Sequence, residues 1–324
     1  MQQEISLARL DSKVRKRRQR IAYLKNYYPL YLMLAPMVIY LLIFSIYPML
    51  GLQIAFKDWK IKQGIWNSPW ATDDNGNILL FKHFIDLFND PAFIEKLINT
   101  LRISGLRLLF GFPIPIIVTI FLNEMPSRKI CKGFQMVSYL PHFISWVIIS
   151  GILTSMTASQ SSFQEFMKSM FGHEVSFFTD GGLFLTVVVI SDIWKEAGWS
   201  TIIYFAALSG ISQDLYEAAN MDGANRWQRM RYITLPGLVP AISINLILAA
   251  SNIIYGGFDQ IFNLYNATVY DIGDIIDTYI YRIGITEGAY DVATAIGLFD
   301  SVISLILVII ANKLIKKIGG DSIW

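Results

Sequence analysis

The sequence predicts an all-α, polytopic integral membrane protein with about six membrane-spanning helices. Hydrophobic residues make up 54% of the chain and charged residues only 16%, whereas soluble domains usually carry about 25% charged residues. Three long stretches also contain no Asp, Glu, Lys or Arg, namely residues 26–56, 133–164 and 232–258. A helix needs about 20 mostly apolar residues to cross a bilayer, and each stretch exceeds that length.

The expected spans follow the apolar stretches in chain order. We expect helices over residues 29–54, 94–123, 134–157, 182–210, 237–262 and 290–315. The second, fourth and sixth spans carry charged residues, among them Lys96, Arg102, Arg107, Asp192, Lys195, Glu196 and Asp300. Pro113, Pro115 and Pro141 are expected to bend the helices that contain them.

Lys and Arg residues are distributed unequally between the connections. Segments 1–28, 125–133, 211–236 and 313–317 share one side of a six-span chain and hold 17 of them, while the opposite loops hold six. Cytoplasmic loops of membrane proteins are enriched in Lys and Arg. Both termini and the 211–236 connection are therefore predicted to be cytoplasmic. Because the basic N-terminus directly precedes a span, we favour this reading over a nucleic-acid-binding patch.

The same pattern divides the chain into four parts. The first apolar stretch is too long for a signal-peptide core, so we expect it to remain as the first helix. The expected parts are a basic cytoplasmic segment at 1–28, a first helix with its outer loop at 29–93, a core of five helices at 94–315, and a cytoplasmic tail at 316–324.

Several kinds of catalytic site are missing from the sequence. The dipeptide Gly-Lys never occurs, so the chain has no G-x-x-x-x-G-K-[ST] loop for ATP. His83, His142 and His173 lie far apart, and the sole cysteine is Cys131, so no zinc-ligand spacing is present. No G-x-S-x-G nucleophile motif occurs either. We therefore expect a protein that is not an enzyme and holds no cofactor or metal of its own.

A polar segment of about twenty residues separates the fourth and fifth spans. Ser212 is expected to cap a short helix that begins near Asp214, and Gly223 then allows a sharp turn. A second short helix is expected from Asn225 to Thr234, with Pro236 ending it. The segment would form a compact knob with alanines at its tip, and the simplest alternative is an amphipathic turn that only links two spans.

The spacing within this segment resembles that of the "EAA" loop in membrane subunits of bacterial ATP-binding-cassette (ABC) importers. In those proteins the loop docks into a groove on the ATPase. The matching residues, with two that lie between them, are Glu217, Ala218, Ala219, Asp222, Gly223, Ala224, Ile233, Leu235 and Pro236. Because so many positions match, we favour a coupling loop at 212–236 over the linking turn.

The likeness extends over nearly the whole chain. Tyr28-Pro29, Ala35-Pro36 and Tyr47-Pro48 in the first span, with Asn99-Thr100-Leu101 in the second, resemble the maltose-type carbohydrate branch. Within that branch the sequence is most similar to permeases for larger oligosaccharides and polysaccharides, such as those of alginate importers.

This resemblance implies a type I ABC importer permease fold and a set of partners. The partners would be a second, homologous permease subunit, two ATPase subunits that bind ATP and Mg²⁺, a periplasmic or lipid-anchored solute-binding protein, an oligosaccharide and the bilayer, with no nucleic acid. The location would be the bacterial cytoplasmic membrane. Importers of amino acids or phosphate remain alternatives within the superfamily. From a different class, a self-sufficient channel or ion-coupled carrier remains possible, with Asp192, Lys195, Glu196 and Asp259 as an ion relay.

Polar residues inside the spans are candidates for the translocation path. A charged side chain in a membrane helix costs about 2.5–3.5 kcal/mol and usually faces a cavity or a partner. Lys195 could pair with an acidic neighbour, contact a carboxylated sugar, or belong to a self-neutralising cluster. Aromatic rings could stack on sugars or only pack, and Asn252 could equally bond another helix. The candidates are Asp192, Lys195, Glu196, Trp199, Tyr204, Asn252, Asp259 and Gln260.

Overall fold

The structure is a computed structural model that describes residues 23–73, 75–320 and 322–323. The basic run from Lys13 to Arg20 lies outside the described residues. Within them the regular secondary structure is helical, apart from two isolated β-bridges in the loop after the first helix.

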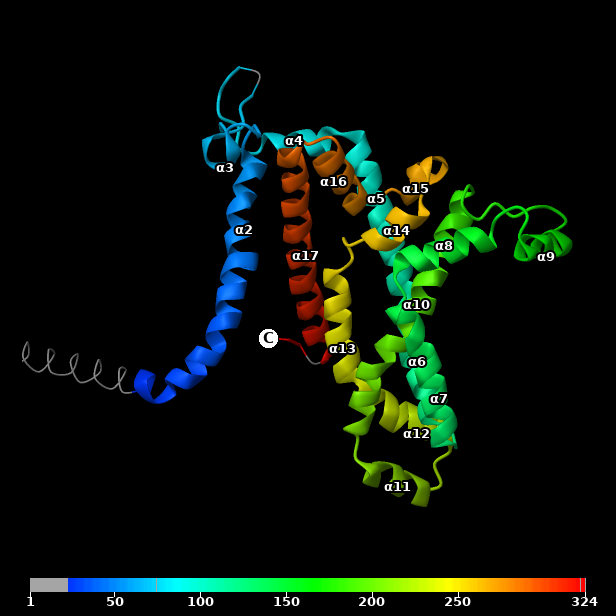
Figure 1. Ribbon diagram of the computed structural model, residues 1–324. Coiled ribbons are helices and arrows are strands. Elements are labelled where there is room, and N and C mark those ends of the chain that lie inside the picture. The colour runs from blue at the N-terminus through cyan, green and yellow to red at the C-terminus, as the bar shows by residue number, and fades with distance from the viewer. Residues whose placement is uncertain (1–22, 74, 321, 324) are drawn as a thin grey trace, which may run out of the picture.

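The long helices run between two ends of the molecule (Figure 1). We call the end that carries α11 (Gln213–Met221) the loop end. The opposite end, which we call the lobe end, carries α3 (Gly64–Asn67), α4 (Lys82–Asn89) and α16 (Ile276–Tyr281).

Within the part of the chain that the structure describes, four continuous helices are long and apolar enough to cross a membrane, and they are Tyr23–Phe56, Pro91–Asn123, Arg226–Ser251 and Tyr290–Lys317. The first, second and fourth of these correspond to the expected first, second and sixth spans. The expected fourth span is α10 (Gly181–Ser209), a single helix whose three central charged residues lower its apolar character. The total of six spans therefore stays a prediction.

The third expected span, 134–157, is broken into two helices at Pro141, the residue expected to bend it. The chain forms α7 (Arg128–Tyr139), a 3₁₀ turn η4 (Leu140–Phe143) and α8 (Trp146–Met156), with a bend of 96° between the two halves. Pro141 lies in the 3₁₀ turn, and the Ser145 hydroxyl then caps α8 by accepting from the Ile148 N–H. Proline and a fresh N-cap together explain why a new helix starts here.

The fifth expected span, 237–262, differs at both ends. Its helix begins as α12 (Arg226–Arg229), passes through a π-helical turn η5 (Met230–Thr234) and continues as α13 (Leu235–Ser251). Pro236 therefore does not end the second loop helix, because the wider π turn before it accommodates the proline ring and its missing N–H. Beyond Asn252 the chain leaves the helix, and α14 (Phe258–Leu264) starts only after Gly257.

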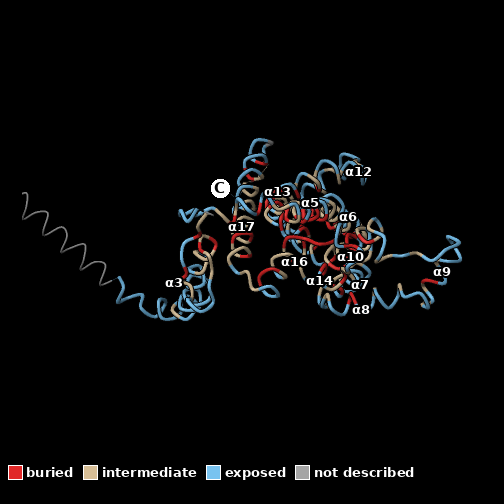
Figure 2. The backbone as a smooth tube through the Cα atoms, turned by 90° about the horizontal axis from the view of Figure 1, so that it is seen from above, coloured by how far each residue is buried: buried red, intermediate tan, exposed pale blue. Residues whose placement is uncertain are grey.

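The first helix lies apart from the rest and turns toward it only at the lobe end (Figure 1). It contains the π turn η1 (Leu42–Ile46) and α2 (Tyr47–Met49), and it ends in the 3₁₀ helix η2 (Leu50–Phe56), which packs on α17 (Tyr290–Ile318). Most of its residues are exposed, and they are coloured pale blue in Figure 2. Such a surface needs lipid or another protein around it.

The loop after η2 forms a small folded lobe with α3 and α4. Its tip is a turn in which the Asp73 carboxylate accepts a 2.7 Å hydrogen bond from the Asn77 N–H. The pKa of the Asp73 carboxyl is lowered, chiefly because the Asn77 backbone N–H donates a hydrogen bond to its charged form. At its base, the backbone N–H of Trp59 donates a 3.1 Å hydrogen bond to the Asp291 carboxylate of α17. The lobe therefore connects the first helix to the last.

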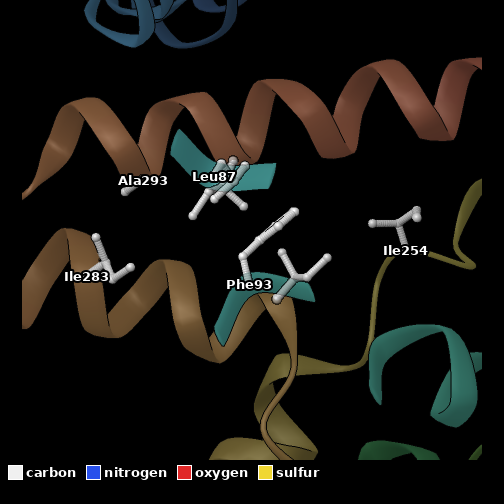
Figure 3. Packing of buried hydrophobic residues seen from close by; sticks show 7 residues of the cluster. Leu87, Phe93, Ile254, Ile283 and Ala293 are labelled. Carbon is white, nitrogen blue, oxygen red and sulfur yellow. The ribbon is translucent and has the colours of Figure 1, made fainter. Parts of the chain in front are cut away.

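Three buried clusters hold the remaining elements together. The first joins α4, α16, α17 and α5 (Pro91–Leu106) around Phe93 (Figure 3). The second packs Phe184 and Val188 of α10 against α14 and its surroundings, and the third joins α10 to Leu238 of α13. The remaining helical elements are η3 (Arg107–Gly111), α6 (Pro113–Asn123), α9 (Ser162–Phe171), η6 (Ala267–Val269), α15 (Tyr270–Gly273) and η7 (Arg282–Thr286).

Candidate functional site

The polar segment between α10 and α13 forms the expected two-helix knob at the loop end (Figure 1). The Ser212 hydroxyl caps α11 by accepting from the Asp214 N–H at 3.2 Å, as the sequence predicted. Asn225 begins the second helix with a capping box, in which Asn225 and Gln228 each accept a hydrogen bond from the other's backbone N–H. These two N-caps fix where each helix begins.

The turn between α11 and α12 depends on Gly223. This residue has φ of 77°, in the left-handed region that glycine adopts readily. The Ala224 N–H then donates to the Ala219 carbonyl at 2.8 Å. The knob is thereby closed on itself, with α11 and α12 joined by only a few residues.

The knob presents side chains that nothing in the described chain covers. Glu217 and Ala218 are exposed, and so are Met221, Trp227 and Tyr232. On the inner side, the Tyr216 hydroxyl lies 3.0 Å from the hydroxyl of Thr234, which is 1% exposed. An exposed apolar surface with acidic and small residues is typical of a protein-docking site.

A cleft of about 630 Å³ lies between the long helices. Its walls come from α5, η3 and α6 on one side, from α10 and Trp146 of α8 on another, and from α13, the segment after it and the start of α14. Six of the eight predicted path residues line it, which are Asp192, Glu196, Tyr204, Asn252, Asp259 and Gln260. The structure thus brings together residues of the expected fourth and fifth spans, with Asp259 and Gln260 placed in α14 beyond the break in the fifth.

Arg107 is the central basic residue of the cleft. Its Nη1 donates to the Gly256 carbonyl at 2.7 Å, its Nη2 donates to the Gln260 side-chain oxygen, and its Nε lies 3.8 Å from the Asp192 carboxylate. Gln260 in turn donates to the Val188 carbonyl at 2.8 Å. Arg107 therefore joins η3, α10 and the broken end of the fifth span.

Lys195 lies behind the cleft wall. It is 6% exposed, and its ammonium donates to the His142 carbonyl at 2.5 Å and lies 3.5 Å from Glu196. It forms no ion pair with Asp192 among the described residues. Lys195 borders a second, smaller cleft of about 420 Å³ instead. Of the alternatives left open by the sequence, pairing within a charged cluster fits this geometry.

Trp199 also lies outside the main cleft. Its ring stacks on His142, with centroids 4.5 Å apart and planes 2° from parallel, and the His142 Nδ1 is 2.8 Å from the Glu196 carboxylate. The tryptophan thus orients a histidine that contacts a cleft residue. Tyr204 lines the cleft but is 3% exposed, so it offers little ring surface for stacking.

Sequence reasoning missed three residues of this site. Arg107 was noted only as a charge within a span, His142 only as an isolated histidine, and Tyr255 not at all. Tyr255 lines the cleft and is 54% exposed. The one usable signal was the position of Arg107 deep in an apolar helix, because such a charge requires a partner.

Comparison with known proteins identifies the family. Residues 91–319 match the family model described as "Binding-protein-dependent transport system inner membrane component". The chain belongs to this family. The permease is 40% identical to Protein LplB of Bacillus subtilis (strain 168) over 305 residues, and the aligned region covers 94% of this chain and 93% of that one.

Two further relatives extend over nearly the full length. The permease is 38% identical over 313 residues to the polygalacturonan/rhamnogalacturonan transport system permease protein YteP of the same organism, covering 96% of this chain and 95% of that one. Among solved structures, it is similar to a chain of a bacterial ABC transporter involved in the import of the acidic polysaccharide alginate. That match has a TM-score of 0.82 and 40% identity, and covers 91% of this chain and 97% of that one. The permease therefore has the expected type I ABC importer fold.

Proposed function

We propose that the permease is a pore-forming subunit of an importer that moves an oligosaccharide or polysaccharide across a bacterial cytoplasmic membrane by alternating access. Its exposed knob at 212–236 would receive an ATPase, and its cleft would form one wall of the path. The observation that carries this proposal is the pairing of a closed, exposed knob with a polar cleft that the same helices, α10 and α13, connect.

The proposed partners follow from what the chain offers. The two ATPase subunits bind the ATP and Mg²⁺, because the sequence has no phosphate-binding loop. A second, homologous permease subunit completes the pore on the open side of the cleft. A solute-binding protein docks at the lobe end, and one solved relative is an alginate ABC transporter in complex with a periplasmic protein bound to alginate pentasaccharide.

The chemistry of the cleft suits a polyhydroxylated substrate. Asp259 and Asn252 are exposed to the cleft, and no side-chain hydrogen bond or ion pair engages the Asp259 carboxylate among the described residues. Carboxylate and amide groups accept and donate the hydrogen bonds that sugar hydroxyls require. Because the wall holds three carboxylates and one guanidinium, an acidic chain such as a uronate polymer would need cations from the second permease subunit.

The test of the loop assignment uses two substitutions, Gly223→Pro and Glu217→Lys. Proline cannot adopt the positive φ of Gly223, and lysine reverses the charge presented at the exposed tip. We expect both variants to insert in the membrane and assemble, yet to hydrolyse ATP without proportionate sugar uptake in proteoliposomes that contain the full complex. Glu165→Lys, an equal charge reversal on exposed α9, serves as the control and should transport normally.

Normal uptake by both loop variants would contradict the proposed role of the knob. A self-sufficient carrier makes a different prediction, since it would move sugar when the permease is reconstituted alone. We expect no uptake without the ATPase subunits.

A further inference from the structure

The side chain of Arg229 joins three elements at the loop end. Its Nη1 donates to the Asn220 side-chain oxygen at 2.5 Å, and its Nη2 lies 3.8 Å from the Glu124 carboxylate. Arg229 and Glu124 are only 21% and 27% exposed, so this contact is partly shielded from water. Their attraction is therefore less screened than that of a fully exposed pair.

The three residues lie at the ends of three different helices. Asn220 is next to last in α11, Arg229 ends α12 and so belongs to the helix that continues into α13, and Glu124 directly follows α6. Among the described residues, this is the one ion pair between segment 212–236 and the rest of the chain. A planar guanidinium with several donors can hold two partners in fixed directions.

The helix that Glu124 follows forms part of the cleft. Pro115 of α6 and Phe112 just before it line the cleft, and α6 packs along α10. Between α5 and α6 lies the π turn η3, followed by Phe112 and by Pro113 as the first residue of α6, and such irregular turns are where helices bend. A force applied to Glu124 can therefore tilt α6 without moving α5.

We propose that the Glu124–Arg229–Asn220 contact is a tether that transmits movement of α11 to α6 and hence to the cleft wall. Arg229 is a positioning residue in this role. The inference rests on the proposed function of 212–236 as the ATPase-binding loop. Movement of the loop already reaches α13 through the covalent chain. The tether adds a second route, because it reaches α6 on the other side of the cleft.

The test measures ATP hydrolysed per sugar imported by the full complex in proteoliposomes. We expect Arg229→Gln and Glu124→Gln each to raise this ratio roughly two- to thirtyfold, the range that single residues in coupling networks produce. The reversed pair, Glu124→Arg with Arg229→Glu, should restore the ratio to within about threefold of the parent, because the amide of Asn220 can donate as well as accept. A residue that only stabilised the fold would not be rescued by charge reversal.

The control is Arg128→Gln, which removes an exposed cation at the same end of the molecule and should leave the ratio unchanged. ATPase co-purification shows that each variant assembles. If both single variants keep the parental ratio, or if the reversed pair is no better than the worse single variant, the tether is wrong. Failure of the proposed function itself gives another pattern, in which Gly223→Pro and Glu217→Lys also stay coupled.

Discussion

At the residue scale, the permease places small and charged side chains where neighbouring helices meet. Gly198 of α10 faces the backbone of Ser138 in α7 so closely that an added Cβ would overlap the Ser138 carbonyl oxygen. Small residues at helix contacts of membrane proteins allow such close approach. Next to this contact, Lys195 and Trp199 hold His142. Single residues therefore determine how the bent third span sits on α10.

The close approach at Gly198 gives the first prediction of stability. Gly198→Ala should lower the free energy of unfolding by about 1–3 kcal/mol, the usual cost of overpacking, because backbone rather than a flexible side chain must move. The measurement is thermal unfolding of the purified complex in detergent. Gly151→Ala in α8 is the matched control, since a Cβ there meets nothing within 4 Å. Equal unfolding temperatures for the two variants would show that α7 does not lie against α10 as described.

At the element scale, broken helices shape the cleft. The expected third and fifth spans both break, one at Pro141–Ser145 and the other after Ser251. Backbone without helical hydrogen bonds is tolerated at membrane depth only where protein groups or water satisfy it. Arg107 does so for the Gly256 carbonyl and Lys195 for the His142 carbonyl.

The break in the third span can be tested through Lys195. Lys195→Met keeps much of the side-chain volume but leaves the His142 carbonyl without its charged donor. Hydrogen bonds to charged groups contribute about 1.5–3 kcal/mol, so we expect a loss of stability of that size in the same unfolding assay. Lys132→Met, on the exposed part of α7, should change little. A Lys195 variant as stable as the parent would mean that this bond does not hold the break.

At the scale of the whole molecule, the two ends differ in character. At the lobe end the first helix is connected to α17, while the loop end carries the exposed knob. From the lobe end, the first helix and α17 both extend in the direction of the loop end (Figure 1). The cleft lies between the long helices, within reach of movements at the knob through α13 and α6. This arrangement suits the proposed role of a subunit that changes conformation when a bound ATPase moves.

The membrane orientation expected from Lys and Arg can be measured by labelling. In a Cys131→Ser background, Asn75→Cys lies in the lobe and Met221→Cys on the knob, where the methionine is 89% exposed. We expect a membrane-impermeant thiol reagent to label the first in intact cells and the second only after the membrane is opened. Labelling of Met221→Cys from outside would place the knob on the wrong side for an ATPase.

Much of the fold could be predicted because its signals are local. Long apolar stretches predicted the helices, and Ser212, Gly223 and Asn225 predicted the knob, since caps and left-handed turns depend on a few neighbouring residues. Helix ends were less predictable. The break after Ser251 depends on Arg107, which lies far away in the chain and donates to the Gly256 carbonyl, and the local residues did not predict the π turn through which the helix continues past Pro236.

The sequence by itself determined that this is a helical membrane protein with a polar knob between two spans and no G-x-x-x-x-G-K-[ST] motif, because composition, hydropathy and motif spacing are properties of short segments. Only the tertiary structure decided which polar groups share the cleft. Arg107, Asp192 and Gln260 meet there, and Lys195 and Trp199 turn away from it. The physical reason is that a buried charge is stable only where packing supplies polar partners for it. Those partners are up to about 150 residues away along the chain.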